Sequence, residues 1–155
     1  MVIVTTKLSK PKLIGILCGA AAVLLLIIVL ANRGGGDGVE TAAGKKLDTP
    51  ASRVEFLASC GYGVSQEPAR TQEVAIPKEW TQVYTQYNAI QQSQGFDLSR
   101  YKGKRVMQYV YLVPDYPGEG SEPVYATLLL YKNKLIGADL SRGGPEGFLR
   151  PLLSA

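Results

Sequence analysis

The chain has 155 residues, a net charge of +4 at neutral pH and no histidine. The absence of histidine excludes Ser-His-Asp and Cys-His nucleophile systems and argues against a zinc site, since imidazole is a usual zinc ligand. Lysines that precede an apolar N-terminal run account for most of the charge, and the nearly neutral remainder argues against a nucleic-acid partner. We therefore expect neither a metal nor another cofactor.

Leu13 to Ala31 form an uncharged apolar run that is long enough to cross the roughly 30 Å hydrocarbon core of a bilayer as one helix. Basic residues precede this run at Lys7, Lys10 and Lys12, and such residues tend to stay on the cytoplasmic side. We expect residues 1–12 in the cytoplasm, a single transmembrane helix at 13–31, and the rest of the chain outside the cell membrane. A signal peptide cleaved after Ala31 is the alternative, but the apolar core of a signal peptide is usually only about 7–15 residues long.

The segment 32–48 is mostly glycine, alanine, threonine and mixed charges, without apolar periodicity, which is typical of a flexible tether. Residues 49–155 remain for one extracytoplasmic domain, which is long enough to form a core without disulfides. Cys60 is the only cysteine outside the apolar run. We expect a buried structural thiol there, and a nucleophile or a dimerising thiol is the alternative.

The first elements of the domain are predicted to be a short helix and a hairpin. Asp48-Thr49-Pro50 supplies a capping residue before a proline suited to the first helical turn, and Gly61 is a stop signal, so a helix is expected at about 50–60. Two β-rich segments, 62–66 and 72–76, flank a turn-forming stretch and predict a hairpin.

An amphipathic helix is predicted at 78–94. Apolar side chains recur at spacings of three and four along it, namely Trp80, Val83, Tyr84, Tyr87 and Ile90. We expect Trp80, Tyr84 and Tyr87 to bury this helix against the sheet, because large aromatics at this spacing are usually core residues. Gly95 is the expected C-terminal stop.

Three further strands are predicted at 104–113, 124–131 and 135–141, with a tight turn at Asn133-Lys134. Their connections are too short for parallel crossovers, so an antiparallel meander is expected. The predicted order is helix, two strands, helix, three strands, which gives an α+β domain of two helices packed on an antiparallel sheet. The last residues, 143–155, are expected to form an irregular tail that places Phe148 and Leu149 on the core.

Asp97, Asp115 and Asp139 are the candidate catalytic acids. Two carboxylates that meet in one cleft could serve as the acid and base of a hydrolase. Turn capping is the simpler interpretation of Asp97 and Asp115. Asp139 lies in an apolar strand, where aspartate is disfavoured, so it either faces solvent or pairs with a basic residue such as Arg142 or Lys104.

Tyrosines on two neighbouring strands are the candidate ligand-binding residues. Tyr109 and Tyr111 share one face of their strand, and Tyr125 and Tyr131 share one face of the next strand, so the four could form one tyrosine panel. Tyrosine suits glycan- and peptide-binding surfaces because it joins a flat apolar ring to a polar tip. Ordinary cross-strand packing is the alternative.

A basic cluster follows the predicted amphipathic helix at Arg100, Lys102, Lys104 and Arg105. A solvated loop is the simpler interpretation of these residues. Attraction to an anionic wall polymer or to lipid headgroups is the functional alternative.

Several motifs lie in the middle of the chain, namely Tyr87-Asn88, Gln91, Gln94-Gly95-Phe96-Asp97-Leu98, Tyr101-Lys102-Gly103-Lys104, Tyr116-Pro117 and Ile136-Gly137-Ala138-Asp139. This pattern resembles an uncharacterised family, the domain of unknown function 4830, over roughly Ser52 to Asp139. Tyr62 and Ala138 depart from the Trp and Gly that are more common in the family. The resemblance implies a small membrane-anchored protein of a Gram-positive bacterium, and it carries no activity to transfer.

Two functions remain open on the sequence alone. The first is a non-catalytic binding or interaction domain that is displayed outside the membrane and contacts an envelope protein or polymer. The second is a carboxylate-dependent hydrolase of cell-envelope polymer that uses two of the three candidate aspartates. A cleft with carboxylates roughly 5–10 Å apart would favour the hydrolase.

Overall fold

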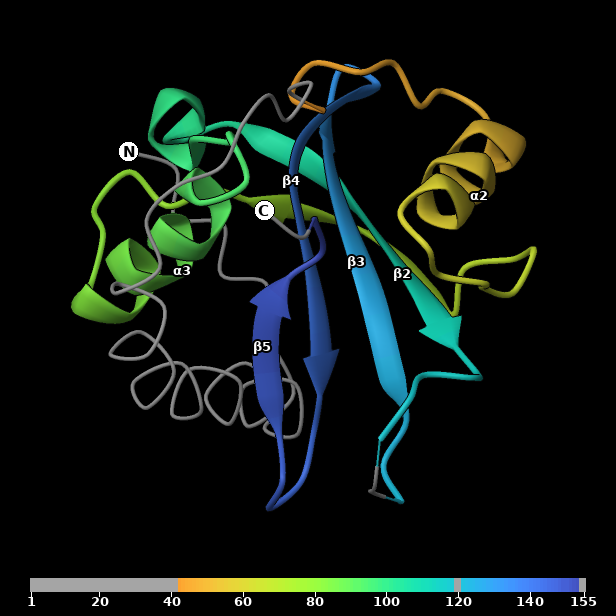
Figure 1. Cartoon of the computed structure of the whole chain (residues 1–155). Helices are drawn as coiled ribbons and strands as arrows, with labels where there is room; N and C mark the ends of the chain where they lie inside the picture. The colour runs from red at the N-terminus through yellow and green to blue at the C-terminus, as the bar shows by residue number, and fades with distance from the viewer. Residues whose placement is uncertain (1–41, 119–120, 154–155) are drawn as a thin grey trace.

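The computed structural model describes residues 42–118 and 121–153 of the chain (Figure 1). The predicted membrane span at 13–31, the predicted cytoplasmic residues 1–12 and the first part of the predicted tether lie outside the described residues. Within 42–118 and 121–153, no helix is long and apolar enough to cross a membrane.

Five antiparallel strands form one meander sheet in the order β1-β2-β3-β4-β5. The strands are β1 (Arg70–Ala75), β2 (Arg105–Val113), β3 (Val124–Tyr131), β4 (Lys134–Arg142) and β5 (Phe148–Pro151). Two α-helices, α2 (Pro50–Ser59) and α3 (Gln82–Gln92), and the 3-10 helix η1 (Leu98–Tyr101) complete the described domain. The predicted α+β class, with two helices on an antiparallel sheet, is confirmed.

The two helices cover opposite faces of the sheet, which lies between them in Figure 1. Successive side chains of a strand point to opposite faces, so each face has its own core. The face under α2 carries Phe56, Leu57, Tyr111, Leu128, Ala138 and Leu140. The face under α3 carries Val106, Leu129 and Ile136, with Ile76 from the residue after β1 and Leu98 from η1.

Side-chain caps fix where the two helices begin. The Thr49 hydroxyl accepts a hydrogen bond from the Ser52 backbone N–H at the start of α2, and Thr81 does the same for Tyr84 at the start of α3. The observed helix α3 therefore begins later than the helix predicted at 78–94. Gly95 follows α3 with a φ of +84°, a conformation that glycine adopts without strain, as the sequence predicted.

The predicted hairpin of 62–66 with 72–76 is wrong. The second segment is β1, but it pairs with β2, and 62–66 is not a strand. The Ser65 N–H donates to the Leu112 carbonyl, so this segment also runs beside β2 instead of folding back on β1. Half-buried Tyr62 and Val64 pack on the α2-face core, which explains why an apolar pattern appears there without a hairpin.

The C-terminal tail contains a strand that the sequence analysis missed. Strand β5 pairs with the last four residues of β4, from Asp139↔Pro151 to Arg142↔Phe148. The edge of β4 has unpaired backbone groups that a short strand can satisfy, even where prolines and glycines weaken the local signal. Phe148 is buried on the core, as predicted.

The end of the predicted tether is part of the folded domain. Residues 42–48 lie against the start of β4, where the Gly44 N–H donates to the Leu135 carbonyl and Lys46 forms an isolated bridge with Lys134. Leu47 is fully buried. The tether was thus predicted too long at its C-terminal end, because the single apolar side chain of Leu47 gives no periodic signal.

The turn between β3 and β4 lies one residue earlier than predicted. Lys132 and Asn133 have φ values of 49° and 63°, which is the left-handed conformation that tight hairpin turns require. Lys134 is already the first residue of β4.

Candidate functional site

Asp139 is buried between β4 and α3. Its carboxylate Oδ2 accepts a hydrogen bond of 2.7 Å from the Tyr87 hydroxyl, and only 4% of the residue is exposed. Burial, opposed by the hydrogen bonds of Tyr87 and Thr127, raises the pKa of Asp139 to about 6. Burial, together with the Asp139 charge, also raises the pKa of Tyr87. The carboxylate lies inside the fold and is not presented to a ligand.

Two glutamines of the α3 region complete the edge of β4. The Gln91 Oε1 accepts the Ala138 N–H, and the Gln94 Nε2 donates to the Ala138 carbonyl, at 2.9 Å in both cases. Side-chain amides therefore take the place of a neighbouring strand at Ala138, just before β5 begins to pair. Gly137 allows this approach, because a Cβ atom there would lie 3.1 Å from the Gln91 Oε1.

Gln94 also holds the C-terminal segment. Its Oε1 accepts the backbone N–H groups of Leu152 and Leu153, at 2.8 and 3.0 Å. One buried side chain thus joins α3, β4 and the residues that follow β5. The sequence analysis placed Gln94 among the family motifs but gave it no role, since a glutamine at a helix end usually faces solvent.

Asp97 has the capping role that was its simpler interpretation. Its Oδ1 accepts the Ser99 N–H at the start of η1 and the side-chain amide of Asn88. The hydrogen bonds to Ser99 and Asn88 lower the pKa of Asp97. The buried Asn88 in turn accepts the Leu98 N–H, so this pair fixes the loop that follows α3.

The three candidate acids have separate settings. Asp97 precedes β2 and caps η1, whereas Asp115 is exposed in the loop that follows β2, and Asp139 is buried under α3. No described hydrogen bond or ion pair connects any two of them. Within 42–118 and 121–153 there is also no group of three or more acidic or cysteine side chains that could hold a metal ion.

The four candidate tyrosines do not form one panel. Tyr109 pairs with Leu128 and Tyr125 pairs with Leu112, so odd-numbered residues of β2 and β3 lie on opposite faces of the sheet. Tyr109 and Tyr111 lie under α2, and Tyr111 is fully buried. Tyr125 and Tyr131 lie on the α3 face, where the Tyr131 ring packs edge-on against Tyr101 with 5.4 Å between centroids.

A buried arginine of α2, Arg53, contacts Tyr109 and Tyr111 of β2. The Arg53 Nε donates to the Tyr111 hydroxyl and its Nη1 donates to the Leu47 carbonyl, both at 3.1 Å. Its guanidinium also lies 3.9 Å from the Tyr109 ring centroid. The sequence analysis missed Arg53, and the one available signal was an arginine beside apolar neighbours in a short helix.

The three aromatics of α3 and its preceding loop are only half-buried. The Trp80 and Tyr84 rings lie 5.1 Å apart and the Tyr84 and Tyr87 rings 5.9 Å apart, beside the α3-face core. The buried residues of α3 are Asn88, Ile90 and Gln91. The predicted aromatic contact with the sheet exists, but polar side chains occupy much of the centre of this interface.

Cys60 is a half-buried free thiol at the end of α2 that packs beside the α2-face core. Burial raises the pKa of this thiol, which reduces its thiolate fraction and hence its reactivity. This setting agrees with a structural role.

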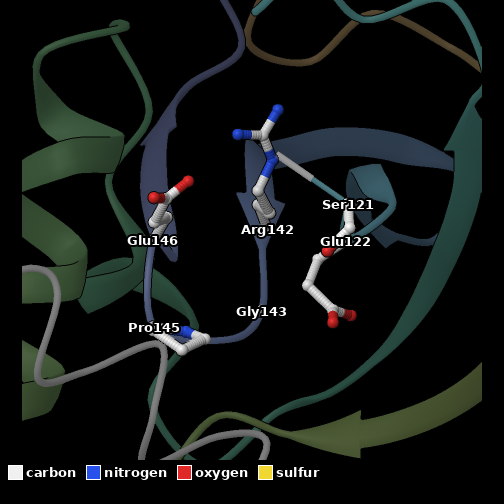
Figure 2. A pocket seen from close by; sticks show the side chains of 6 residues that line it. All are labelled: Ser121, Glu122, Arg142, Gly143, Pro145 and Glu146. Carbon is white, nitrogen blue, oxygen red and sulfur yellow. The ribbon is translucent and has the colours of Figure 1, made fainter. Parts of the chain in front are cut away.

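A hollow of about 250 Å³ opens at the end of the sheet where β4 turns into β5 (Figure 2). It is lined by Ser121, Glu122, Arg142, Gly143, Pro145 and Glu146. Figure 2 shows the Arg142 side chain between the side chains of the two glutamates. The Arg142 guanidinium also lies 5.1 Å from the Phe148 ring centroid and 5.9 Å from that of Tyr116. The lining of the hollow therefore combines one cation with two carboxylates, and two aromatic rings lie near the cation.

The sheet with one helix on each face defines a small α+β domain, whose buried polar residues lock α3 to the edge of β4. The chain belongs to the family described as domain of unknown function 4830, whose sequence profile matches residues 56–140. No curated protein and no solved structure gives a significant match. The motif residues Asn88, Gln91, Gln94 and Asp97 are the ones that fasten α3 and its following loop.

Proposed function

We propose that this protein is a membrane-anchored, extracytoplasmic binding domain that recognises a partner in the cell envelope of a Gram-positive bacterium. The apolar run at 13–31 and its basic N-terminal flank support the anchor and its orientation. The observation that carries the binding function is the hollow around Arg142.

The chemistry of this hollow favours a ligand that has both amino and carboxylate groups. The Arg142 guanidinium can bind a carboxylate, and the exposed Glu122 and Glu146 can bind an amine. The Phe148 and Tyr116 rings lie beside the Arg142 guanidinium and help to position it. The stem peptide of peptidoglycan has this combination of groups, in the side-chain amine of its diamino acid and in its C-terminal carboxylate.

A titration of the full chain in detergent micelles with a soluble peptidoglycan stem peptide tests this proposal. We expect saturable heat of binding, and Glu146→Gln should weaken it by about tenfold, which corresponds to about 1.4 kcal/mol. Arg70→Gln removes an exposed charge outside the hollow and should bind like the wild type. Absence of saturable binding would overturn the proposal, and a shortened peptide in the mass spectrum would favour the hydrolase instead.

The orientation has its own test. Protease added to intact protoplasts should digest the residues that follow 13–31 and leave the N-terminal residues 1–12 protected. Protection of the C-terminal domain would show that the proposed topology is reversed.

A further inference from the structure

The lysines of the described residues lie at one end of the sheet, where β1 and β3 end and β2 and β4 begin (Figure 1). They are Lys45, Lys46, Lys78, Lys102, Lys104, Lys132 and Lys134. All of them are exposed, and so is Arg105, the first residue of β2. We call this surface the lysine end.

Backbone pairing and side-chain contacts hold these residues together although they come from four segments of the chain. The backbone of Lys46 forms an isolated antiparallel β-bridge with the backbone of Lys134 at the start of β4. The Ile76 N–H, just after β1, donates to the Lys104 carbonyl, just before β2. The Lys102 ammonium lies 4.4 Å from the Trp80 ring centroid, which places this loop beside the start of the α3 segment.

Acidic residues neutralise only part of the lysine end. Lys46 pairs with Asp48 at 2.8 Å and Arg105 pairs with Glu73 at 2.7 Å, and the exposed Glu79 lies next to Lys78 in the chain. The other six lysines form no ion pair with any described residue. The surface therefore keeps a clear excess of positive charge.

The opposite end of the sheet lacks this excess of positive charge. Among the described residues it carries the carboxylates Glu67, Asp115, Glu122 and Glu146 and the arginines Arg70 and Arg142, and no lysine. The positive charge is thus concentrated at one end of the strands. An anionic surface attracts the lysine end more strongly than the other end.

The chain also enters the domain at the lysine end. Residues 42–47 cross this end and pair with the start of β4, as Figure 1 shows. Only residues 32–41 separate them from the apolar run at 13–31, and a chain of that length spans at most about 35 Å when fully extended. The lysine end is therefore the part of the domain that is kept closest to an anchoring membrane.

We propose that the lysine end docks on the anionic headgroups of the membrane in which the protein is anchored. This inference rests on the proposed anchor, and it orients the domain so that the hollow around Arg142 faces away from the bilayer. Exposed lysines near an anionic bilayer each contribute a factor of about five to binding, within a Debye length of about 8–10 Å. The short segment 32–41 keeps the lysine end near the membrane, and the positive charge of the lysine end is complementary to the anionic headgroups.

The test uses the full chain reconstituted in vesicles of phosphatidylcholine, or of phosphatidylcholine with a third of phosphatidylglycerol. A membrane-impermeant acetylating reagent is added, and the acetylation rates of Lys45 and Lys46 are followed by mass spectrometry. We expect a rate about fivefold lower on the anionic vesicles at low salt, and equal rates at high salt. In the variant Arg70→Lys, the new lysine at the opposite end should react equally on both kinds of vesicle.

A pair of charge reversals supplies the matched control. Lys134→Glu should remove most of the protection of Lys45 and Lys46, whereas Arg70→Glu changes the net charge equally and should leave the protection intact. Equal acetylation of the wild type on both vesicles, or equal effects of the two reversals, would overturn the docking. The docking would also be overturned if a soluble polyphosphate polymer protected Lys45 and Lys46 from acetylation while anionic lipid did not. Extraction of the chain by alkaline carbonate would instead show that the anchor itself is wrong, and the docking would fall with it.

Discussion

Different kinds of interaction hold the two helices against the two faces of the sheet. Under α2 the interface is an apolar core with one buried cation, Arg53, that binds a tyrosine hydroxyl and a backbone carbonyl. Under α3 the interface holds buried amides and a buried carboxylate, with fewer apolar side chains. Apolar burial is non-directional, whereas each buried hydrogen bond requires one geometry. The α2 face therefore supplies more of the stability, and the α3 face fixes the position of its helix.

The largest effect is expected on the α2 face. Tyr111→Ala removes a fully buried ring and the partner of the Arg53 Nε, so it should reduce the free energy of unfolding by about 3–5 kcal/mol. The matched variant Tyr125→Ala, at a half-buried position on the other face, should cost about 1 kcal/mol or less. Urea unfolding of the full chain in micelles, followed by the fluorescence of Trp80, measures both. Similar losses in the two variants would contradict the claim that Tyr111 is a core residue and Tyr125 is not.

Gln94→Leu tests how much the buried hydrogen bonds of the α3 face contribute to stability. This variant leaves the N–H groups of Leu152 and Leu153 and the Ala138 carbonyl without the side chain that binds them. Buried groups left without a hydrogen bond cost about 1–3 kcal/mol each, so we expect a total loss of about 3–4 kcal/mol after partial relaxation. Gln92→Leu, at the exposed last position of α3, is the control and should change stability by about 0.5 kcal/mol or less. A loss that is no larger than that of the control would refute the role of Gln94.

Asp139 should make the stability of the α3 face depend on pH. Because its folded-state pKa of about 6 lies above the ordinary value of 3.8, the folded state binds this proton more tightly than the unfolded state between those values. The contribution of Asp139 to the free energy of unfolding therefore falls by up to about 3 kcal/mol as the pH rises through this window. Asp139→Asn cannot ionise and should lose this slope while it still accepts the Tyr87 hydroxyl.

Unfolding free energies at several pH values between 4 and 8 check this prediction. Asp115→Asn, in an exposed loop, is the control and should keep the pH profile of the wild type. A profile of Asp139→Asn that has the same slope as the wild type would show that the buried carboxylate does not carry the effect.

The smallest effect is expected at the rim of the α3 face. Trp80 is half-buried, its Nε1 donates to the Pro77 carbonyl, and Lys102 covers its ring. Trp80→Ala should therefore cost about 1–2 kcal/mol, less than the roughly 3–5 kcal/mol typical of a fully buried tryptophan. Near-UV circular dichroism during urea unfolding gives this value without the tryptophan signal. A loss as large as that of Tyr111→Ala would show that the rim is part of the core.

Local sequence patterns predicted the α+β class, both helices and strands β2 to β4, because apolar periodicity, caps and turn residues act over a few positions. They could not predict which strands pair or in what register. Tyr109 and Tyr125 each share a face with the expected neighbour on their own strand, yet the β2–β3 register places the two pairs on opposite sides of the sheet. Strand β5, the packing of 42–48 and the role of Gln94 depend in the same way on the edge of β4, which exists only after the sheet has formed.

The same limit applied to the candidate sites. Asp139 stood out as an acid in an apolar strand, and its burial under Tyr87 explains why, but its partner is separated from it by 52 positions in the sequence. The hollow around Arg142 joins the end of the β2–β3 loop to the β4–β5 turn, so no single segment carries a motif for it.

Photo-crosslinking tests whether the hollow around Arg142 receives an envelope ligand and leaves it unchanged. The full chain is reconstituted in vesicles, incubated with a stem peptide that carries a diazirine group, and irradiated, and the crosslinked residues are mapped by mass spectrometry. We expect crosslinks at Ser121, Glu122 and 143–146 that unlabelled peptide competes away, and we expect the peptide to be recovered intact. Crosslinks confined to the lysine end, or a cleaved peptide, would contradict this expectation.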